Sequence, residues 1–152
     1  WLYEQEAQLL PPRELKLSVE GPKCIRTGSD ITLVACSYSV QLALEACARL
    51  EQHGISAEVI DLRVLKPFSP ELIIESVKKT GRLLAVDAGW RTAGFSSEVI
   101  ASVVEAMDPA SMLSPPQRIT LPEAPAPTSS KLETLYYPTS EDICSKILQM
   151  VR

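Results

Sequence analysis

Polar side chains that could bind or react follow two apolar runs of the sequence. The run "ITLVAC" (residues 31–36) leads into Ser37, Tyr38 and Ser39, just before a helical pattern begins. Three hydroxyl groups beside the free N–H groups of a helix start could bind an anion. Serines in front of a helix also cap those N–H groups, so a purely structural role is the alternative.

A second loop, "DAGWRTAGF" (residues 87–95), carries residues typical of a binding surface. Tryptophan and arginine are enriched in binding hot spots, because a rigid ring and a fork of donors make much contact per ordered side chain. Tyr136 and Tyr137 add further amphipathic surface. We therefore predict an interface with another polypeptide at Trp90, Arg91 and Phe95. The alternative is that Trp90 folds back over its own sheet.

Catalytic patterns elsewhere in the sequence are incomplete. Asp87 and Glu98 could act as acid and base, but a strand-end aspartate and a first-turn glutamate also have structural explanations. His53, the only histidine, stands at an expected helix end with no thiol or carboxylate at ligand spacing. The glycines of "GWRTAG" match neither phosphate-binding spacing. We expect no catalytic residue, no cofactor-binding residue and no metal ligand in this chain.

Composition narrows the classes of partner. The chain has 152 residues, a formal charge of −4 and no basic cluster, which argues against a nucleic-acid surface. No apolar stretch approaches the ~20 residues of a membrane-spanning helix. Four cysteines without a C-x-x-C pair are expected to be free thiols in a reducing compartment, with a disulfide or metal site as the alternative. A start at Trp1 without a signal pattern indicates a fragment or a processed product.

Apolar runs of strand length recur at residues 31–36, 57–63, 82–87 and 117–121. Near-continuous apolar strands separated by helical patterns predict a parallel sheet covered on both faces. The stretch "KCIRTGSDITLVAC" reads as a hairpin that adds an antiparallel edge strand at residues 23–26. The predicted fold class is α/β, a three-layer α/β/α sandwich around about five mostly parallel strands.

Four helical patterns connect or follow these strands. They lie within residues 39–54, 69–81, 94–107 and 139–152. The first should bury Val40, Ala43, Leu44, Cys47 and Leu50. The second should begin with Ser69 as N-cap, and the fourth with a capping box from Thr139 to Asp142.

Proline-rich stretches divide the rest of the chain. Residues 1–22 hold three prolines and show no sustained period, so we interpret them as a linker from a missing N-terminal domain. Residues 23–152 then form the folded domain. The proline-rich stretch around residues 117–121 should be an extended connection on both sides of one short strand.

Several motifs in order resemble a known domain. They are "GSDITLVA", "EVIDLRVLKPF", "ESVKKTGRLLAV", "GWRTAGFSSEV", "RITLPEAPAP" and "YYPTSEDI", with "LYEQEAQLLP" similar to an interdomain linker. Together they resemble the transketolase C-terminal-like domain. The resemblance is closest to the β subunit of the thiamine-diphosphate-dependent decarboxylating component of 2-oxoacid (pyruvate or branched-chain) dehydrogenase complexes.

The resemblance implies a role in assembly. In that family this domain adds subunit contacts near the loop with Trp90, Arg91, Gly94 and Phe95, and part of the acyltransferase docking surface near Val151 and Arg152. The implied partners are its own N-terminal domain, a second β subunit, an α subunit and the acyltransferase core, without nucleic acid or membrane. Thiamine diphosphate and magnesium would belong to the complete enzyme, not to this chain. The implied location is the bacterial cytoplasm or the mitochondrial matrix.

Departures from the family pattern leave the particular complex open, and two other functions remain as alternatives. Ser96 and Ser97 stand where the family often has glycine or alanine, and the chain reads "RITLPEAPAP", with Leu121 and Pro122, where the family commonly has "RVTGxDxPxP". One alternative is a regulatory module that binds small anions through the two strand-end loops. The other is the C-terminal domain of a different transketolase-like enzyme, such as a deoxyxylulose-phosphate synthase.

Overall fold

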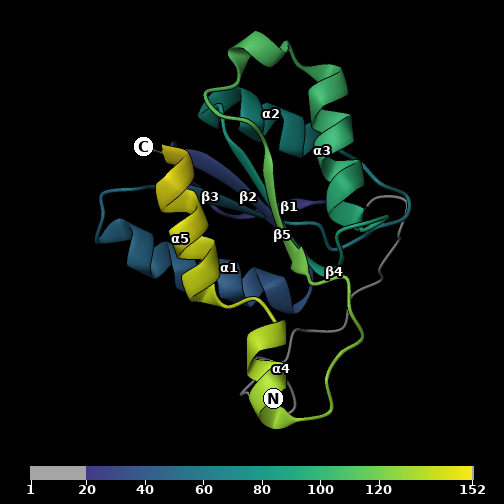
Figure 1. Cartoon of the computed structure of the whole chain (residues 1–152). Helices are drawn as coiled ribbons and strands as arrows, with labels where there is room; N and C mark the ends of the chain where they lie inside the picture. Colours follow the sequence, from purple (N-terminus) through teal and green to yellow (C-terminus); the bar gives the residue numbers. More distant parts are fainter. Residues whose placement is uncertain (1–19, 152) are drawn as a thin grey trace, which may run out of the picture.

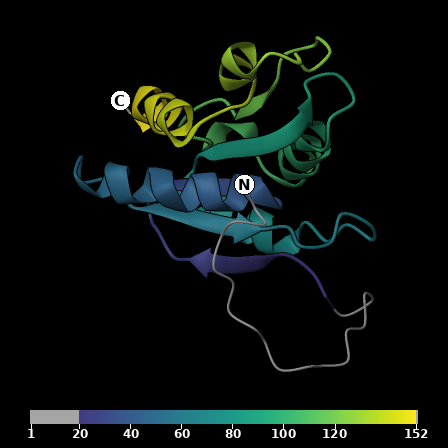
Figure 2. The same ribbon diagram turned by 90° about the horizontal axis from the view of Figure 1, so that it is seen from below.

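A five-stranded mixed sheet forms the centre of the computed structural model, which describes residues 20–151. The strands are β1 (Lys23–Arg26), β2 (Ile31–Ala35), β3 (Ala57–Asp61), β4 (Leu83–Trp90) and β5 (Gln117–Leu121). Their order in the sheet is β1-β3-β2-β4-β5, so β1 and β5 lie at opposite edges (Figure 2). Three of the four neighbouring pairs are parallel, and only β1 with β3 is antiparallel. The predicted fold class is confirmed.

Helices cover both faces of this sheet (Figure 1). On one face lie α1 (Tyr38–Glu51) and α5 (Ser140–Val151), which pack with alternate side chains of β2, β3 and β4. On the other lie α2 (Glu71–Thr80) and α3 (Phe95–Ala106), which pack with the remaining side chains of the same strands. Because successive strand residues face opposite sides, the fully buried run of β2 supplies both cores.

Polar groups inside the second of these cores bond to one another. Thr32 of β2 shares hydrogen bonds with Ser76 at 2.6 Å and Thr80 at 2.8 Å, both on α2. Glu58 of β3 pairs with Lys79 and accepts the N–H group of Gly28 at 3.2 Å. Buried hydroxyls and carboxylates are tolerated when they have such partners.

The predicted hairpin is wrong, although the antiparallel edge strand is confirmed. β1 pairs with β3, not with β2. The turn between β1 and β2 is tied to the start of β3, because Ser29 and Asp30 both donate their N–H groups to the Ser56 carbonyl, at 3.0 and 2.9 Å. Gly28 lies so close to this strand that an added Cβ would be 2.2 Å from the Ala57 carbonyl carbon. The sheet position next to β2 is therefore occupied by β3.

Other expectations were met in part. Leu44 is 40% exposed, and Leu42 and Ala46 take its place in the buried face of α1. The second helix begins at Glu71, and Ser69 does not cap it. The capping box of α5 is confirmed: the Asp142 N–H group donates to Thr139 Oγ1 at 3.2 Å, and the Thr139 N–H group donates to the Asp142 carboxylate at 2.8 Å.

One helix was not predicted. The proline-rich connection after β5 contains α4 (Ser130–Tyr136), and a single 3₁₀ turn, η2 (Pro109–Ser111), precedes β5. The seven residues of α4 are too few to show a full amphipathic period. Across residues 20–151, every helix is too short or too polar to cross a lipid bilayer.

Candidate functional site

Asp87 organises the loop that carries the predicted interface residues. Its Oδ1 accepts the N–H group of Gly89 at 2.8 Å, and its Oδ2 accepts the N–H group of Ser96 at 2.9 Å. The side chain is almost completely buried, and both oxygens are occupied by backbone donors. Glu98 is exposed in the first turn of α3, and no hydrogen bond joins it to Asp87 in the described part of the chain. This geometry favours the structural interpretation of both carboxylates.

Tight backbone packing keeps the same loop in one conformation. Gly94 is the N-cap residue of α3, and an added Cβ there would be 2.1 Å from the Trp90 carbonyl oxygen. Ala93 has a φ of 57°, a left-handed conformation that is uncommon outside glycine. Strand β4 continues past Asp87 to Trp90, so the loop is shorter than the sequence predicts. Trp90 is therefore presented from the end of a strand, not from a flexible loop.

Trp90 is half exposed, with 54% of its surface accessible. Its Nε1–H group makes a long hydrogen bond of 3.4 Å to the Tyr136 hydroxyl of α4, which in turn donates to the Ala124 carbonyl at 2.7 Å. Tyr137, 45% exposed, packs edge-on against Tyr136 with ring centroids 5.1 Å apart. We call Trp90, Tyr136 and Tyr137 the aromatic patch. One edge of the indole rests on its own chain while the rest of the ring is accessible.

The other predicted loop residues differ in exposure. Arg91 is exposed, whereas Phe95 is half buried. The Phe95 ring packs edge-on against Phe68 with centroids 5.1 Å apart and belongs to the core beneath α3. Its role in an interface stays a prediction, and its packing in this chain is mainly with its own core.

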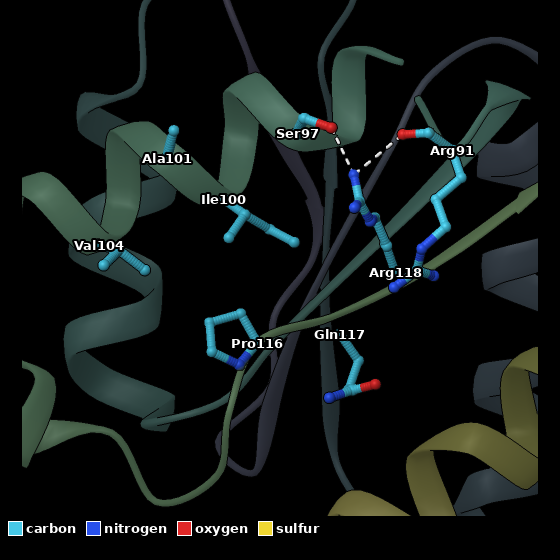
Figure 3. Close-up of a pocket in the computed structure, with 8 residues that line it drawn as sticks. All are labelled: Arg91, Ser97, Ile100, Ala101, Val104, Pro116, Gln117 and Arg118. Carbon is cyan, nitrogen blue, oxygen red and sulfur yellow. Dashed lines mark hydrogen bonds between the residues drawn. The ribbon is translucent and has the colours of Figure 1, made fainter. Parts of the chain in front are cut away.

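A pocket of about 430 Å³ opens beside Arg91, between α3 and β5 (Figure 3). Arg118 of β5 donates from Nη1 to the Arg91 carbonyl at 3.1 Å and to the Ser97 hydroxyl. The other walls of the pocket come from Ile100, Ala101, Val104, Pro116 and Gln117. Arg118 was not predicted, although an arginine inside a short apolar strand is a known feature of edge strands.

Glu123 connects the loop after β5 to the loop after β4. Its Oε1 accepts the N–H group of Thr92 at 2.9 Å and also the Thr92 hydroxyl. These bonds, and to a smaller extent the charges of Arg91 and Arg118, lower the pKa of the Glu123 carboxyl below its ordinary value. The sequence offered no signal for this contact, because 31 residues separate the two partners.

The predicted anion-binding loop has few free donors. The N–H groups of Ser39 and Val40 donate to the carbonyls of Cys36 and Ser37, at 3.2 and 3.1 Å. Ser37 is exposed at the N-cap position but makes no side-chain cap, and Ser39 is buried. Tyr38 is half buried against the core beneath α1. The three hydroxyl-bearing residues therefore differ in burial, from exposed Ser37 to buried Ser39.

A small cavity does join the two strand-end loops. It measures about 10 Å³ and is lined by Cys36, Asp87, Phe95 and Ser96 among others. The Ser96 hydroxyl is buried there without a hydrogen-bond partner in the described chain. A space of this size admits about one water molecule. Burial, followed by the charges of Asp87 and Asp61, raises the pKa of the Cys36 thiol, which makes it a poor nucleophile.

The second group of predicted interface residues lies at the other end of the sheet. Val151 ends α5 and is half buried against the core, and Arg152 lies outside the described residues. Arg82, just before β4 begins, donates from Nε to the Met150 carbonyl at 3.1 Å. Trp90 is at the opposite end of the same strand. The structure therefore does not bring Trp90 and Val151 into one surface.

The cysteines and acidic residues do not form a metal site in the described part of the chain. All four cysteines are free thiols. Within residues 20–151, no three histidine, cysteine, aspartate or glutamate side chains group closely enough to hold a metal ion. Burial raises the pKa of the Cys47 thiol to about 11, so this group is also unreactive at neutral pH.

Comparison with known proteins gives a consistent family. The family model described as transketolase, C-terminal domain, matches residues 22–143. A Caenorhabditis elegans protein named pyruvate dehydrogenase E1 component subunit beta, mitochondrial, is 40% identical over 82% of this chain and 36% of its own length. An Arabidopsis thaliana protein named 2-oxoisovalerate dehydrogenase subunit beta 2, mitochondrial, is 35% identical over 100% of this chain and 40% of its own length.

Solved structures show the same fold. A split gene transketolase, described as an inactive beta4 tetramer, matches with a TM-score of 0.72 and 28% identity, over 86% of this chain and 43% of that chain. The chain thus spans about two fifths of the length of the proteins to which it is similar.

Proposed function

Because the chain belongs to the transketolase C-terminal domain family, we propose that it is the C-terminal domain of a 2-oxoacid dehydrogenase β subunit. The complete enzyme would be thiamine-diphosphate-dependent. The support is the similarity to two β subunits over four fifths or more of this chain. Within that enzyme the domain serves assembly and carries no catalysis by itself.

One observation supports the assembly role: Trp90 is half exposed at the end of strand β4. Asp87 and Gly94 hold the segment that follows β4, so a partner would meet a preorganised surface. Preorganisation lowers the entropy cost of binding, and large aromatic rings supply most of the energy in many interfaces. The proposed partners are the N-terminal domain of the same subunit, a second β subunit, an α subunit and the acyltransferase core.

The pocket between α3 and β5 does not fit thiamine diphosphate with its magnesium ion. Magnesium on a diphosphate is held by one or two carboxylates, and none of the residues that line this pocket is acidic. We therefore assign the cofactor to the missing part of the enzyme and derive no reaction step from this chain. Two relatives carry "mitochondrial" in their names, which supports a mitochondrial matrix location in a eukaryote, with the cytoplasm as the bacterial equivalent.

Activity of the isolated chain tests this proposal. The chain, mixed with thiamine diphosphate, magnesium and either pyruvate or 3-methyl-2-oxobutanoate, should release no carbon dioxide above the buffer rate. Addition of the separately expressed α subunit alone should not restore turnover, because the cofactor-binding half of the β subunit is still missing. Decarboxylation by the chain itself would refute the non-catalytic role.

A different transketolase-like enzyme is the second candidate, favoured by the structural match to a split gene transketolase. The two candidates differ in the gene that surrounds the segment. A β subunit would end a polypeptide about two and a half times as long as this chain, judged from the shares of the relatives covered. A much longer polypeptide that also carries the α-type half would support a single-chain enzyme of the second kind. A split transketolase has a chain only about twice as long as this one, so the reaction of the reassembled two-subunit enzyme, ketol transfer or 2-oxoacid decarboxylation, distinguishes that case.

A further inference from the structure

The pocket between α3 and β5 has one charged end and one apolar end. Figure 3 shows the side chains of Arg91 and Arg118 at one end, Val104 at the other, and Ile100 and Pro116 between them. Val104 is 37% exposed although it is a valine on a helix. The volume of the pocket, about 430 Å³, is within the ~300–1,000 Å³ range of binding pockets.

The two guanidinium groups have no carboxylate partner in the described chain. Each of the ion pairs found among residues 20–151 involves other cations. Glu123 lies close enough to feel both charges, but its Oε1 is engaged by Thr92. In a chain with a formal charge of −4, two such arginines at one pocket mark a site for a negative group.

One side of this pocket is formed by β5, an edge strand of the sheet. It is the last strand of the sheet, and its outer edge pairs with no described strand. Pro116, Gln117 and Arg118, at the start of this strand, all line the pocket, and Arg118 bonds to Ser97 of α3. A peptide added to the edge of β5 would place its own alternate side chains beside these residues.

A second copy of this chain fits the pocket poorly. In a two-fold interface through β5, the same patch would meet itself, so Arg91 and Arg118 would approach their own counterparts. Like charges placed opposite each other across paired strands are destabilising. The charge pattern requires an acidic partner that differs from this surface.

We propose that the α3–β5 pocket binds an acidic peptide segment of a partner polypeptide that adds a strand to β5. The segment places an aliphatic side chain against Ile100, Val104 and Pro116. Two residues away it places an aspartate or glutamate between Arg91 and Arg118. The recognised pattern is therefore an aliphatic and an acidic residue separated by one position, in either order according to strand direction.

Selection from a displayed library of random dodecapeptides tests this inference on the whole chain. Enriched sequences should share the aliphatic–x–acidic spacing, and synthetic copies should bind in a titration followed by backbone amide shifts. Arg118→Gln should weaken binding about tenfold, as expected for loss of a charge-assisted contact. Lys23→Gln on β1, at the opposite edge of the sheet, removes the same charge and should leave binding unchanged.

A second variant keeps the proposal testable even if Arg118→Gln does not fold. Val104→Glu alters an exposed position of α3 and should abolish binding, because it places a carboxylate where the aliphatic side chain of the peptide would pack, while thermal unfolding stays near that of the wild type. Enrichment of sequences without acidic residues, or none at all, would overturn the proposal. So would binding that survives both variants, or millimolar inorganic phosphate that shifts the same amides and displaces the peptide, since the site would then be one for small anions.

The inference deepens the proposed assembly role and rests on it for the existence of a partner. Different results would refute the proposed function and the peptide site. Turnover by the isolated chain would refute the proposed non-catalytic function and leave the peptide selection unaffected, whereas failed selection with an inactive chain would refute only the peptide site at β5.

Discussion

The carboxylate of Asp87 accepts two backbone N–H groups, and through them a single residue joins the end of β4 to the start of α3. The sequence predicts Asp87 at the end of the apolar strand, but β4 continues three residues further, to Trp90. The hydrogen-bond partners of Asp87 could not be predicted, because the contact with Ser96, nine residues later, depends on the conformation of the loop between them. Because both carboxylate oxygens accept backbone hydrogen bonds, the structure disfavours the alternative in which Asp87 acts as an acid or base.

Trp90 offers the most direct test at the scale of a residue. Trp90→Ala should weaken self-association of the chain at least tenfold, because central tryptophans often contribute about 2 kcal/mol or more to an interface. Folding stability should fall less, since the ring is 54% exposed and its hydrogen bond to Tyr136 is long. Sedimentation equilibrium and urea unfolding measure the two effects separately.

Phe95→Ala is the matched control for that experiment. Its ring is half buried against Phe68, so truncation should cost about 2 kcal/mol of stability through lost apolar contact. If the Trp90 variant unfolds as easily as the Phe95 variant and associates like the wild type, the indole serves its own fold and the interface prediction is wrong.

Glu123 predicts a pH dependence. Hydrogen bonds from Thr92, with the nearby charges of Arg91 and Arg118, lower the pKa of this carboxyl in the folded chain. A lowered folded pKa contributes stability that is present above the unfolded pKa of about 4.3 and is lost as the pH falls through the folded pKa. Relative to the wild type, Glu123→Gln should therefore melt earlier at pH 6, and the gap should close toward pH 3.

Thermal unfolding across that pH range provides the measurement, with Glu105→Gln, an exposed substitution on α3, as control for net charge. A gap between wild type and Glu123→Gln that widens as the pH falls would contradict the sign of this linkage. Direct titration of the Glu123 carboxyl carbon by NMR should also give a midpoint below 4.3.

At the scale of elements, the strands were predictable because their signal is local. β2, β3 and the first part of β4 are buried on both faces, so each is a near-continuous apolar run. The pairing of β1 was not predictable, because a strand of four residues carries no information about which neighbour it joins. That choice depends on contacts of Gly28, Ser29 and Asp30 with the start of β3, far along the chain.

Helix α4 was missed for a related reason. Its stability comes from Tyr136, which is buried and reaches the Ala124 carbonyl, and not from an apolar stripe. The aromatic patch around Trp90 was therefore foreseen only as separate residues. The sequence could not predict that Trp90, Tyr136 and Tyr137 meet, because this depends on the course of the proline-rich segment before α4, which local sequence patterns do not define.

The capping box of α5 gives a prediction at the same scale. Thr139→Ala removes the acceptor for the Asp142 N–H group and should lower the free energy of unfolding by about 1 kcal/mol. Ser129→Ala is the matched control, because Ser129 occupies the N-cap position of α4 without making a side-chain cap. Its effect should stay within about 0.5 kcal/mol in urea unfolding. Equal losses in both variants would mean that the hydrogen bonds of the box add nothing.

At the scale of the whole molecule, the two groups of predicted interface residues are separated by the length of a strand. Trp90 ends β4, whereas the end of α5 is bound by Arg82 just before β4 begins. Eight residues at ~3.3 Å each place these regions ~25 Å apart. We therefore expect two separate contact surfaces that can be occupied at the same time.

Separate surfaces predict independent effects. Val151→Ala should lower stability by about 1 kcal/mol, since Val151 packs against the core beneath α1 and α5, and should leave self-association unchanged. Combined with Trp90→Ala, the double variant should show unfolding and association free energies that sum to within about 0.5 kcal/mol, as expected for sites more than ~10 Å apart. Sedimentation equilibrium and urea unfolding of the four proteins complete the cycle. A Val151 variant that weakens self-association, or a coupling above that limit, would mean that both ends of the sheet belong to one interface.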